Sequence, residues 1–269
     1  MSGGGRDQPR GRLALALSLA AALSWLAVGG LNWGWLDWGR PGANAAEVPA
    51  AVATAWAEPA AAKADPPAPA SDGPYPIAHL PGDVDSFDVP GGQPTGTVAG
   101  EWWGYPSALP VIARSGGFLL VRLQQRPNQS TAWIAADGVE ITTTPYRIVI
   151  DLAAGRLKLL NLGETVLDAP AVVGRPATPT PAGHFFVTML QPGASAGYGR
   201  QVLVLSGHSE TIDDWRGSGD AVIAIHGPLG DDASVDAAAA ISNGCVRLHL
   251  EDLDALAELV PPGSPVDIG

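Results

Sequence analysis

The chain has little cysteine and little basic charge. Cys245 is the only cysteine in 269 residues, so no disulfide bond can form within the chain. Lysine and arginine total 15 against 27 aspartates and glutamates, which gives a net charge of −12. That balance argues against electrostatic binding to nucleic acid or to anionic lipid. Charged residues make up only 16% of the chain and hydrophobic residues 46%, so neither a coiled coil nor an acidic disordered chain describes the whole.

An uncharged apolar run spans residues 13–36 and follows three arginines within the first 12 residues. This order is typical of a signal peptide or a signal anchor, and the run is long enough to span about 30 Å of hydrocarbon as a helix. An A-x-A sequence of the kind that signal peptidase cleaves stands at 43–45, but it lies far beyond the run. We therefore expect residues 1–40 to hold an uncleaved signal anchor, with a cleaved signal peptide as the alternative. The protein is then exported to the outer face of the cytoplasmic membrane, the periplasm or the cell wall.

Residues 41–82 are rich in alanine and proline, a composition typical of an extended linker without a packed core. In residues 83–142, glycine, proline or asparagine interrupts short apolar runs every few residues, which predicts a small β barrel or sandwich. The segment 131–139 (TAWIAADGV) resembles the closing strands of a bacterial SH3-like module. The barrels of that family bind wall components or pack on a catalytic domain. The cluster at 102–105 (WWGY) is either a ligand platform or part of the module's core.

Residues 145–269 combine alternating apolar segments with one helix. The pattern predicts a hairpin from residues 147–151 and 156–162. Further strands are expected at 165–173, 184–189, 201–205, 221–225 and 264–268. An apolar stripe at three- and four-residue spacing over 250–260 predicts a helix that ends at the Pro-Pro-Gly of 261–263. The fold class is therefore mainly β, with a sandwich-like domain at 145–269.

The only cysteine follows a polar turn, Ser242-Asn243-Gly244, and His226 ends an apolar strand nineteen residues upstream of it. An imidazole that draws off the thiol proton would lower the pKa of Cys245 below about 8.5 and supply a thiolate nucleophile. The adjacent glycine lets backbone N–H groups approach an oxyanion. A buried small hydrophobic residue is the alternative interpretation of a lone cysteine. One histidine and one cysteine are too few ligands for a metal site.

Three segments together resemble the L,D-transpeptidase catalytic domain family (YkuD type). They are His226-Gly227 followed after a spacer by 241–248 (ISNGCVRL), the opening hairpin 146–160 (YRIVIDLAAGRLKLL), and 177–185 (ATPTPAGHF). The resemblance covers about 125 residues. Two departures stand out: Asn243 stands where the family more often has histidine, and 237–240 (AAAA) replaces the usual glycine.

The resemblance implies a peptidoglycan L,D-transpeptidase that needs no cofactor. Its substrates are peptidoglycan stem peptides. Cys245 would attack the carbonyl between the third and fourth residues of a tetrapeptide stem and release the terminal D-Ala. An amine of another stem would then resolve the thioester, with His226 as general base and then acid. Water as the acceptor, which defines an L,D-carboxypeptidase, and a non-catalytic wall-binding protein stay open as alternatives.

The resemblance also implies supporting roles around this pair. Ser242 and Gly227 would orient the loop and the histidine, and the N–H groups of Gly244 and Cys245 are candidates for the oxyanion hole, with Asn243 beside them. Arg247 either holds a substrate carboxylate or forms a structural ion pair with Glu251 or Asp252. Tyr198 lies between two glycines and is a candidate for the substrate groove. The remaining histidines singled out, read as core or surface residues, are His184, His208 and His249.

Overall fold

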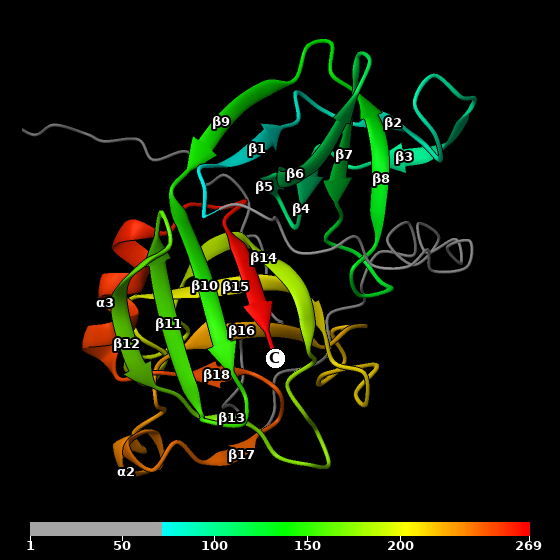
Figure 1. Cartoon of the computed structure of the whole chain (residues 1–269). Helices are drawn as coiled ribbons and strands as arrows, with labels where there is room; N and C mark the ends of the chain where they lie inside the picture. Colours follow the sequence, from blue (N-terminus) through cyan, green and yellow to red (C-terminus); the bar gives the residue numbers. More distant parts are fainter. Residues whose placement is uncertain (1–71) are drawn as a thin grey trace, which may run out of the picture. The chain divides into compact units, whose positions relative to one another are not determined.

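The computed structural model describes residues 72–269, which form a seven-stranded sheet, an eight-stranded sheet and two small strand pairs (Figure 1). The predicted signal anchor and residues 41–71 of the predicted linker lie outside the described residues. Within residues 72–269, no helix is long and apolar enough to cross a membrane. The prediction of a mainly β protein is confirmed.

The seven-stranded sheet comes first in the chain and has the strand order β3-β2-β8-β7-β6-β1-β9. Its strands are β1 (Tyr75–His79), β2 (Val84–Phe87), β3 (Pro94–Val98), β6 (Ala108–Ser115), β7 (Phe118–Arg122), β8 (Thr131–Ala135) and β9 (Glu140–Thr144). The same part of the chain also forms a small hairpin of β4 (Glu101–Trp102) and β5 (Tyr105–Pro106). Short strands in 83–142 are as predicted, whereas the resemblance to an SH3-like module stays a prediction.

The strand β1 lies inside the stretch 41–82 that the composition assigned to a linker. It pairs with both β6 and β9, and Tyr75, Ile77 and Ala78 are buried. The linker prediction is therefore wrong for residues 75–79. The prolines at 74 and 76 made this segment look like linker, although its apolar residues form a strand that packs into the sheet.

The eight-stranded sheet has the order β12-β11-β10-β19-β14-β15-β16-β18. Its strands are β10 (Tyr146–Asp151), β11 (Arg156–Asn161), β12 (Glu164–Pro170), β14 (Gly183–Pro192), β15 (Gln201–His208), β16 (Val222–His226), β18 (Val246–Arg247) and β19 (Pro265–Ile268). The other elements are the strand pair β13 (Val173–Gly174) and β17 (Ala240–Ser242), the 3-10 helix η1 (Ala196–Tyr198), α2 (Asp232–Asp236) and α3 (Leu250–Leu259).

The predicted strands of this domain are confirmed, and the last of them closes the sheet. β10 and β11 form the expected antiparallel hairpin, with Ile148 opposite Leu159. The final strand, β19, lies parallel to β10 and antiparallel to β14, so it joins the hairpin to the rest of the sheet. The sequence did not predict the short elements β13, α2, β17 and β18, whose lengths are below what a periodic pattern can indicate.

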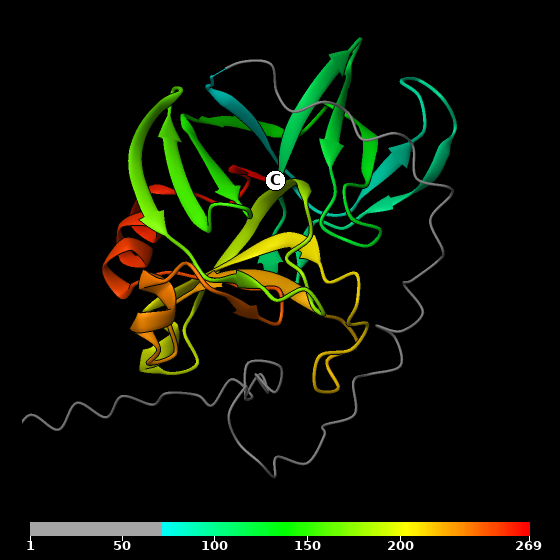
Figure 2. The ribbon, with the colours of Figure 1, turned by 60° about the horizontal axis from the view of Figure 1, so that its bottom comes forward.

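The sheet curls around an apolar core. Figures 1 and 2 show β15 and β16 running across the direction of β10 and β11. The enclosed core takes its side chains from nearly every strand of the sheet and from α3, which packs against β12 and β15. Leu253 and Leu256 of α3 are fully buried. The helix ends before Pro261, because proline disfavours the α conformation in the residue that precedes it.

The segment 124–130 of the first module attaches to the loop between β15 and β16. Arg126 donates from Nε to Asp220 Oδ1 at 2.9 Å and from its terminal nitrogen to the carbonyls of Ser209 and Ile212. The Asn128 side chain exchanges two hydrogen bonds of 2.8 Å with the backbone of His208. These contacts tie together two segments that lie 80 or more residues apart in the chain.

His208 is fully buried in the middle of this attachment. Its Nε2 lies 2.8 Å from the carbonyl of Gln124, and its Nδ1 lies 2.7 Å from Asp220 Oδ2. Burial opposes ionisation of Asp220, but the bonds from His208 and Arg126 outweigh it and lower the pKa of that carboxyl. His208 is thus the structural histidine that the sequence suggested.

Replacing Arg126 with alanine should lower the free energy of unfolding by about 1–3 kcal/mol, because a buried carboxylate and two carbonyls each lose one donor. Urea denaturation of the full chain measures this. Arg156→Ala is the matched control, since Arg156 pairs with Asp168 while both side chains are about 40% exposed, and it should cost at most about 1 kcal/mol. Equal losses in the two variants would contradict the attachment.

Candidate active site

The register of two parallel strands brings the predicted histidine and cysteine to one face of the sheet. β16 pairs with β18 so that Ile225 lies opposite Val246 and His226 opposite Arg247. Cys245 is therefore level with Ala224. Side chains two residues apart on a strand share a face, so His226 lies on the face of Ala224 and Cys245.

The apolar clusters confirm this assignment of faces. Ile223, Ile225 and Val246 belong to the domain core on one side of the sheet. Ala224 and Cys245 belong to a second cluster on the other side. The nucleophile candidate thus lies on the face opposite the domain core.

His226 is held in one orientation by its own neighbours. Its Nδ1 lies 2.8 Å from the carbonyl of Gly227, which can only accept, so Nδ1 carries the proton and Nε2 is the basic nitrogen. The ring of Tyr198 lies 4.9 Å from the imidazole, centroid to centroid. A Cβ on Gly227 would lie 2.5 Å from the carbonyl oxygen of Gly197, so only glycine lets this turn approach the histidine.

Ser242 fixes the turn that carries Cys245. Its hydroxyl donates to the carbonyl of Cys245 at 2.6 Å and accepts from the N–H of Gly244 at 3.0 Å. The N–H of Gly244 is therefore occupied, and the prediction that it serves an oxyanion hole is wrong. The N–H of Cys245 stays a candidate. Gly244 itself adopts φ +114°, a conformation that L side chains rarely adopt.

The segment 178–180 braces the same turn from outside. Thr180 donates to the carbonyl of Gly244 at 2.8 Å, and Thr178 donates to the carbonyl of Ser242 at 3.1 Å. Asn243 accepts a hydrogen bond from Arg175. Asn243 is thus a structural contact of the turn, and the threonines explain the TPTP sequence that the family resemblance rested on.

Burial leaves both candidate catalytic groups neutral. It raises the pKa of the Cys245 thiol to about 11, although the Ala224 backbone and Arg247 act in the opposite direction. It also lowers the pKa of His226 to about 4. The prediction of a thiol pKa below its ordinary value is therefore wrong, because the sequence does not show how deeply the pair is buried. The resting site holds a thiol and a neutral imidazole.

Arg247 and Tyr198 both lie beside this pair. The Nε of Arg247 is buried and has no hydrogen-bond partner within residues 72–269. Over the same residues, Arg247 forms no ion pair with Glu251 or Asp252, so the structural alternative for it is wrong. Burial and the neighbouring Cys245 raise the pKa of Tyr198 to about 12.

The other histidines singled out are structural. His249 precedes α3 and contacts Asp232 and Asp236 of α2 at 3.1 and 2.9 Å. His184 lies 2.7 Å from Asp267. In the part of the chain that the structure describes, no three His, Cys, Asp or Glu side chains are grouped to hold a metal ion.

Sequence reasoning missed two contributions to this region. The side chains of Trp102 and Tyr105 in the first module pack against the cluster that contains Cys245. Arg216, on the loop between β15 and β16, is close enough to Tyr198 to influence its pKa. The cluster at 102–105 stands out in the sequence, but nothing there links it to Cys245, and no local motif marks Arg216.

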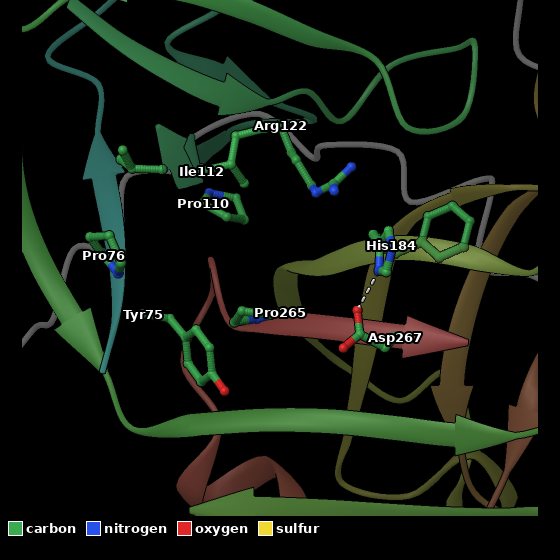
Figure 3. A pocket seen from close by; sticks show the side chains of 10 residues that line it. Tyr75, Pro76, Pro110, Ile112, Arg122, His184, Pro265 and Asp267 are labelled. Atoms are coloured by element: carbon green, nitrogen blue, oxygen red, sulfur yellow. Dashed lines mark hydrogen bonds and ion pairs between the residues drawn. The ribbon is translucent and has the colours of Figure 1, made fainter. Parts of the chain in front are cut away.

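A cavity of about 410 Å³ lies away from this pair, between the first sheet and the start of β14 (Figure 3). Tyr75, Arg122 and the hydrogen-bonded pair His184 and Asp267 supply its polar groups. Its lining includes no cysteine, serine, threonine or lysine. We therefore take the Cys245 region as the candidate active site.

The fold and the site define an L,D-transpeptidase-type catalytic domain, and the comparisons agree. Residues 145–268 match the family model of the L,D-transpeptidase catalytic domain, YkuD. The chain is 32% identical to YkuD of Bacillus licheniformis over 126 residues, which are 47% of this chain and 67% of the relative. It is 29% identical to YkuD of Bacillus subtilis over 152 residues, 54% and 83% of the two chains. The chain belongs to the YkuD-type L,D-transpeptidase family.

A solved structure of an L,D-transpeptidase from Mycobacterium smegmatis also matches. Its TM-score is 0.38 and its identity 18%, over 60% of this chain and 90% of that one.

Alkylation of the single cysteine tests the protonation state of the resting site. Because the pKa of Cys245 is about 11, the rate with iodoacetamide should rise about tenfold per pH unit from pH 7 to pH 10. Mass spectrometry of the full chain gives the rate, and the urea-unfolded chain is the control, since its thiol titrates near about 8.5. A rate in the folded protein that levels off below pH 8 would show a thiolate and contradict the neutral pair.

Proposed function

We propose that this protein is a peptidoglycan L,D-transpeptidase in which Cys245 is the nucleophile and His226 the general base and acid. The observation that carries the proposal is that both side chains lie on one face of the sheet, as the β16–β18 register requires. The Gly227 carbonyl accepts a hydrogen bond from Nδ1 of His226, which makes Nε2 the nitrogen that can take up a proton. Membership of the family supports peptidoglycan as the substrate.

The reaction proceeds in two acyl transfers. Nε2 of His226 takes the thiol proton while Sγ of Cys245 attacks the carbonyl carbon between the third and fourth residues of the stem. The imidazolium returns that proton to the leaving amine, D-Ala departs, and a thioester remains. An amine from another stem then attacks the thioester, His226 takes its proton, and the thiol is regenerated as the cross-link forms.

Because both groups are neutral at rest, the thiolate does not form before the substrate is bound. With a thiol pKa of about 11 and a histidine pKa of about 4, ion-pair formation before substrate binding is strongly unfavourable. Proton transfer accompanies attack, when charge moves to the carbonyl oxygen. We assign the backbone N–H of Cys245 as the donor to that oxygen, since the N–H of Gly244 is already bonded to Ser242.

Arg247 is the substrate-binding cation of the proposal. Its guanidinium lies on the strand position opposite His226, and its buried Nε lacks a partner within the described residues. A planar guanidinium binds a carboxylate through two parallel hydrogen bonds, and peptide stems carry carboxylates. Tyr198 forms the neighbouring wall of the same region.

The proposal includes export, because the wall substrate lies outside the cytoplasm. Residues 13–36 serve as the signal anchor and residues 41–71 as the spacer from the membrane. Water in place of the acceptor amine would turn the same acyl-enzyme into an L,D-carboxypeptidase, which the assay below distinguishes.

The full chain, incubated with purified disaccharide-tetrapeptide, should release D-Ala and yield a cross-linked dimer by mass spectrometry. Cys245→Ala and His226→Gln should each lower the rate at least about a thousandfold, as loss of a catalytic nucleophile or base does. His249→Gln is the matched control and should keep the rate, because the His249 ring is bonded to carboxylates of α2. Tripeptide monomer without dimer would establish the carboxypeptidase. Full activity of Cys245→Ala would overturn the proposal.

Arg247→Lys should raise KM for the disaccharide-tetrapeptide about tenfold and change kcat much less, because lysine keeps the charge but loses the bidentate geometry. Steady-state kinetics measure the two constants. Arg156→Lys, an exposed site on β11, is the control. An equal fall in kcat at unchanged KM would show that Arg247 acts on the chemical step instead.

A further inference from the structure

The β4–β5 hairpin of the first module carries three aromatic side chains. Trp102 pairs with Tyr105 across the hairpin, and Trp103 and Gly104 form its turn. The indole rings of Trp102 and Trp103 are stacked, with centroids 5.3 Å apart and an angle of 27° between planes. The hairpin thus presents flat aromatic surface.

The turn is built at a cost in backbone strain. Trp103 has φ +52° and Gly104 has φ +78°. A two-residue turn with both φ values positive favours Asn-Gly or Gly-Gly, and a bulky residue at the first position is an outlier. The chain therefore holds a large indole, 37% exposed, where glycine or asparagine would be more stable. Strained residues of this kind cluster at ligand-binding and active sites, so the outlier motivates a hypothesis of function.

The hairpin is continuous with the candidate active site. Trp102 and Tyr105 pack against the cluster of Met189, Val202, Val204, Ala224 and Cys245. Tyr198, whose ring also contacts His226, packs against the same cluster. The base of the hairpin is therefore anchored beside Cys245, and its tip, Trp103, reaches solvent.

We infer that this hairpin is a saccharide subsite that binds a hexosamine ring of the glycan strand whose stem peptide enters the active site. The inference rests on the proposed function. A pyranose ring presents a face of C–H groups, which carry partial positive charge and stack on the negative face of an indole. Burial of that apolar face adds to the affinity.

The chemistry of the hairpin favours the sugar over the stem peptide. The hexosamines are the flat-faced rings of a peptidoglycan substrate, whereas stems consist of small and charged residues. The hairpin, residues 101–106, contains no cation to pair with a stem carboxylate, and its carboxylate is Glu101. Recognition of the stem thus falls to Arg247 and Tyr198, and recognition of the glycan to the hairpin.

Binding to a glycan without a stem tests the subsite independently of catalysis. The full chain carrying Cys245→Ala is titrated with N,N′,N″,N‴-tetraacetylchitotetraose by calorimetry, alone and with Trp103→Gly added. We expect the dissociation constant to rise about tenfold with Trp103→Gly. The unfolding temperature should not fall, since glycine adopts this turn without strain. Val89→Ala, an exposed apolar residue of the same module, is the matched control and should leave binding unchanged.

Kinetics on two substrates assign the contact. In the otherwise unaltered enzyme, Trp103→Gly should raise KM for the disaccharide-tetrapeptide and leave KM for the free tetrapeptide unchanged. Equal increases for both substrates would place the peptide on the hairpin and overturn the saccharide subsite. Chitotetraose that fails to bind, or binds both proteins equally, would also overturn it. Absence of D-Ala release by the unaltered enzyme would refute the proposed function instead, while the calorimetric result would still decide the subsite.

Discussion

The site depends on the parallel pairing of β16 with β18. Each strand is short, and they are separated in the chain by α2, β17 and the turn 242–245. Their register places the imidazole of His226 and the thiol of Cys245 on one face. A shift by one residue would turn one of the two side chains to the domain core, because alternate residues face opposite sides. The hydroxyls of Ser242, Thr178 and Thr180 hold the intervening turn and so prevent that shift.

Burial of the pair has a chemical consequence that the spacing of the residues does not reveal. An acyl-enzyme is exposed to hydrolysis wherever water reaches the thioester. Cys245 is 7% exposed and His226 is 2% exposed, so few water molecules have access to the reacting atoms. The same burial suppresses the thiolate, and the reactivity of the free enzyme falls with it. In the proposed reaction, a buried neutral pair therefore has low nucleophilicity at rest and little contact with bulk water.

Much of the second domain could be predicted from the sequence, because the patterns that indicate its elements each lie within a short segment of the chain. The β10–β11 hairpin alternates strictly, α3 carries a clear apolar stripe, and Ser242 to Cys245 form a compact motif. Contacts between distant segments left no such signal. Arg126 meets Asp220 across 94 residues of chain, and the pairing of Trp102 and Tyr105 with the Cys245 cluster depends on how the first module docks. The thiol pKa was predicted in the wrong direction for the same reason, since desolvation is a property of the packed structure.

The first module acts on the site through two separate attachments. Arg126 and Asn128 bind the loop between β15 and β16, and that loop leads directly into the strand that ends at His226. The β4–β5 hairpin covers the apolar face that includes Ala224 and Cys245. One attachment therefore restrains the strand that ends at His226, and the other forms surface beside Cys245. A module joined only by a flexible linker would make neither contact, so the first module is packed against the second domain as well as joined to it in the chain.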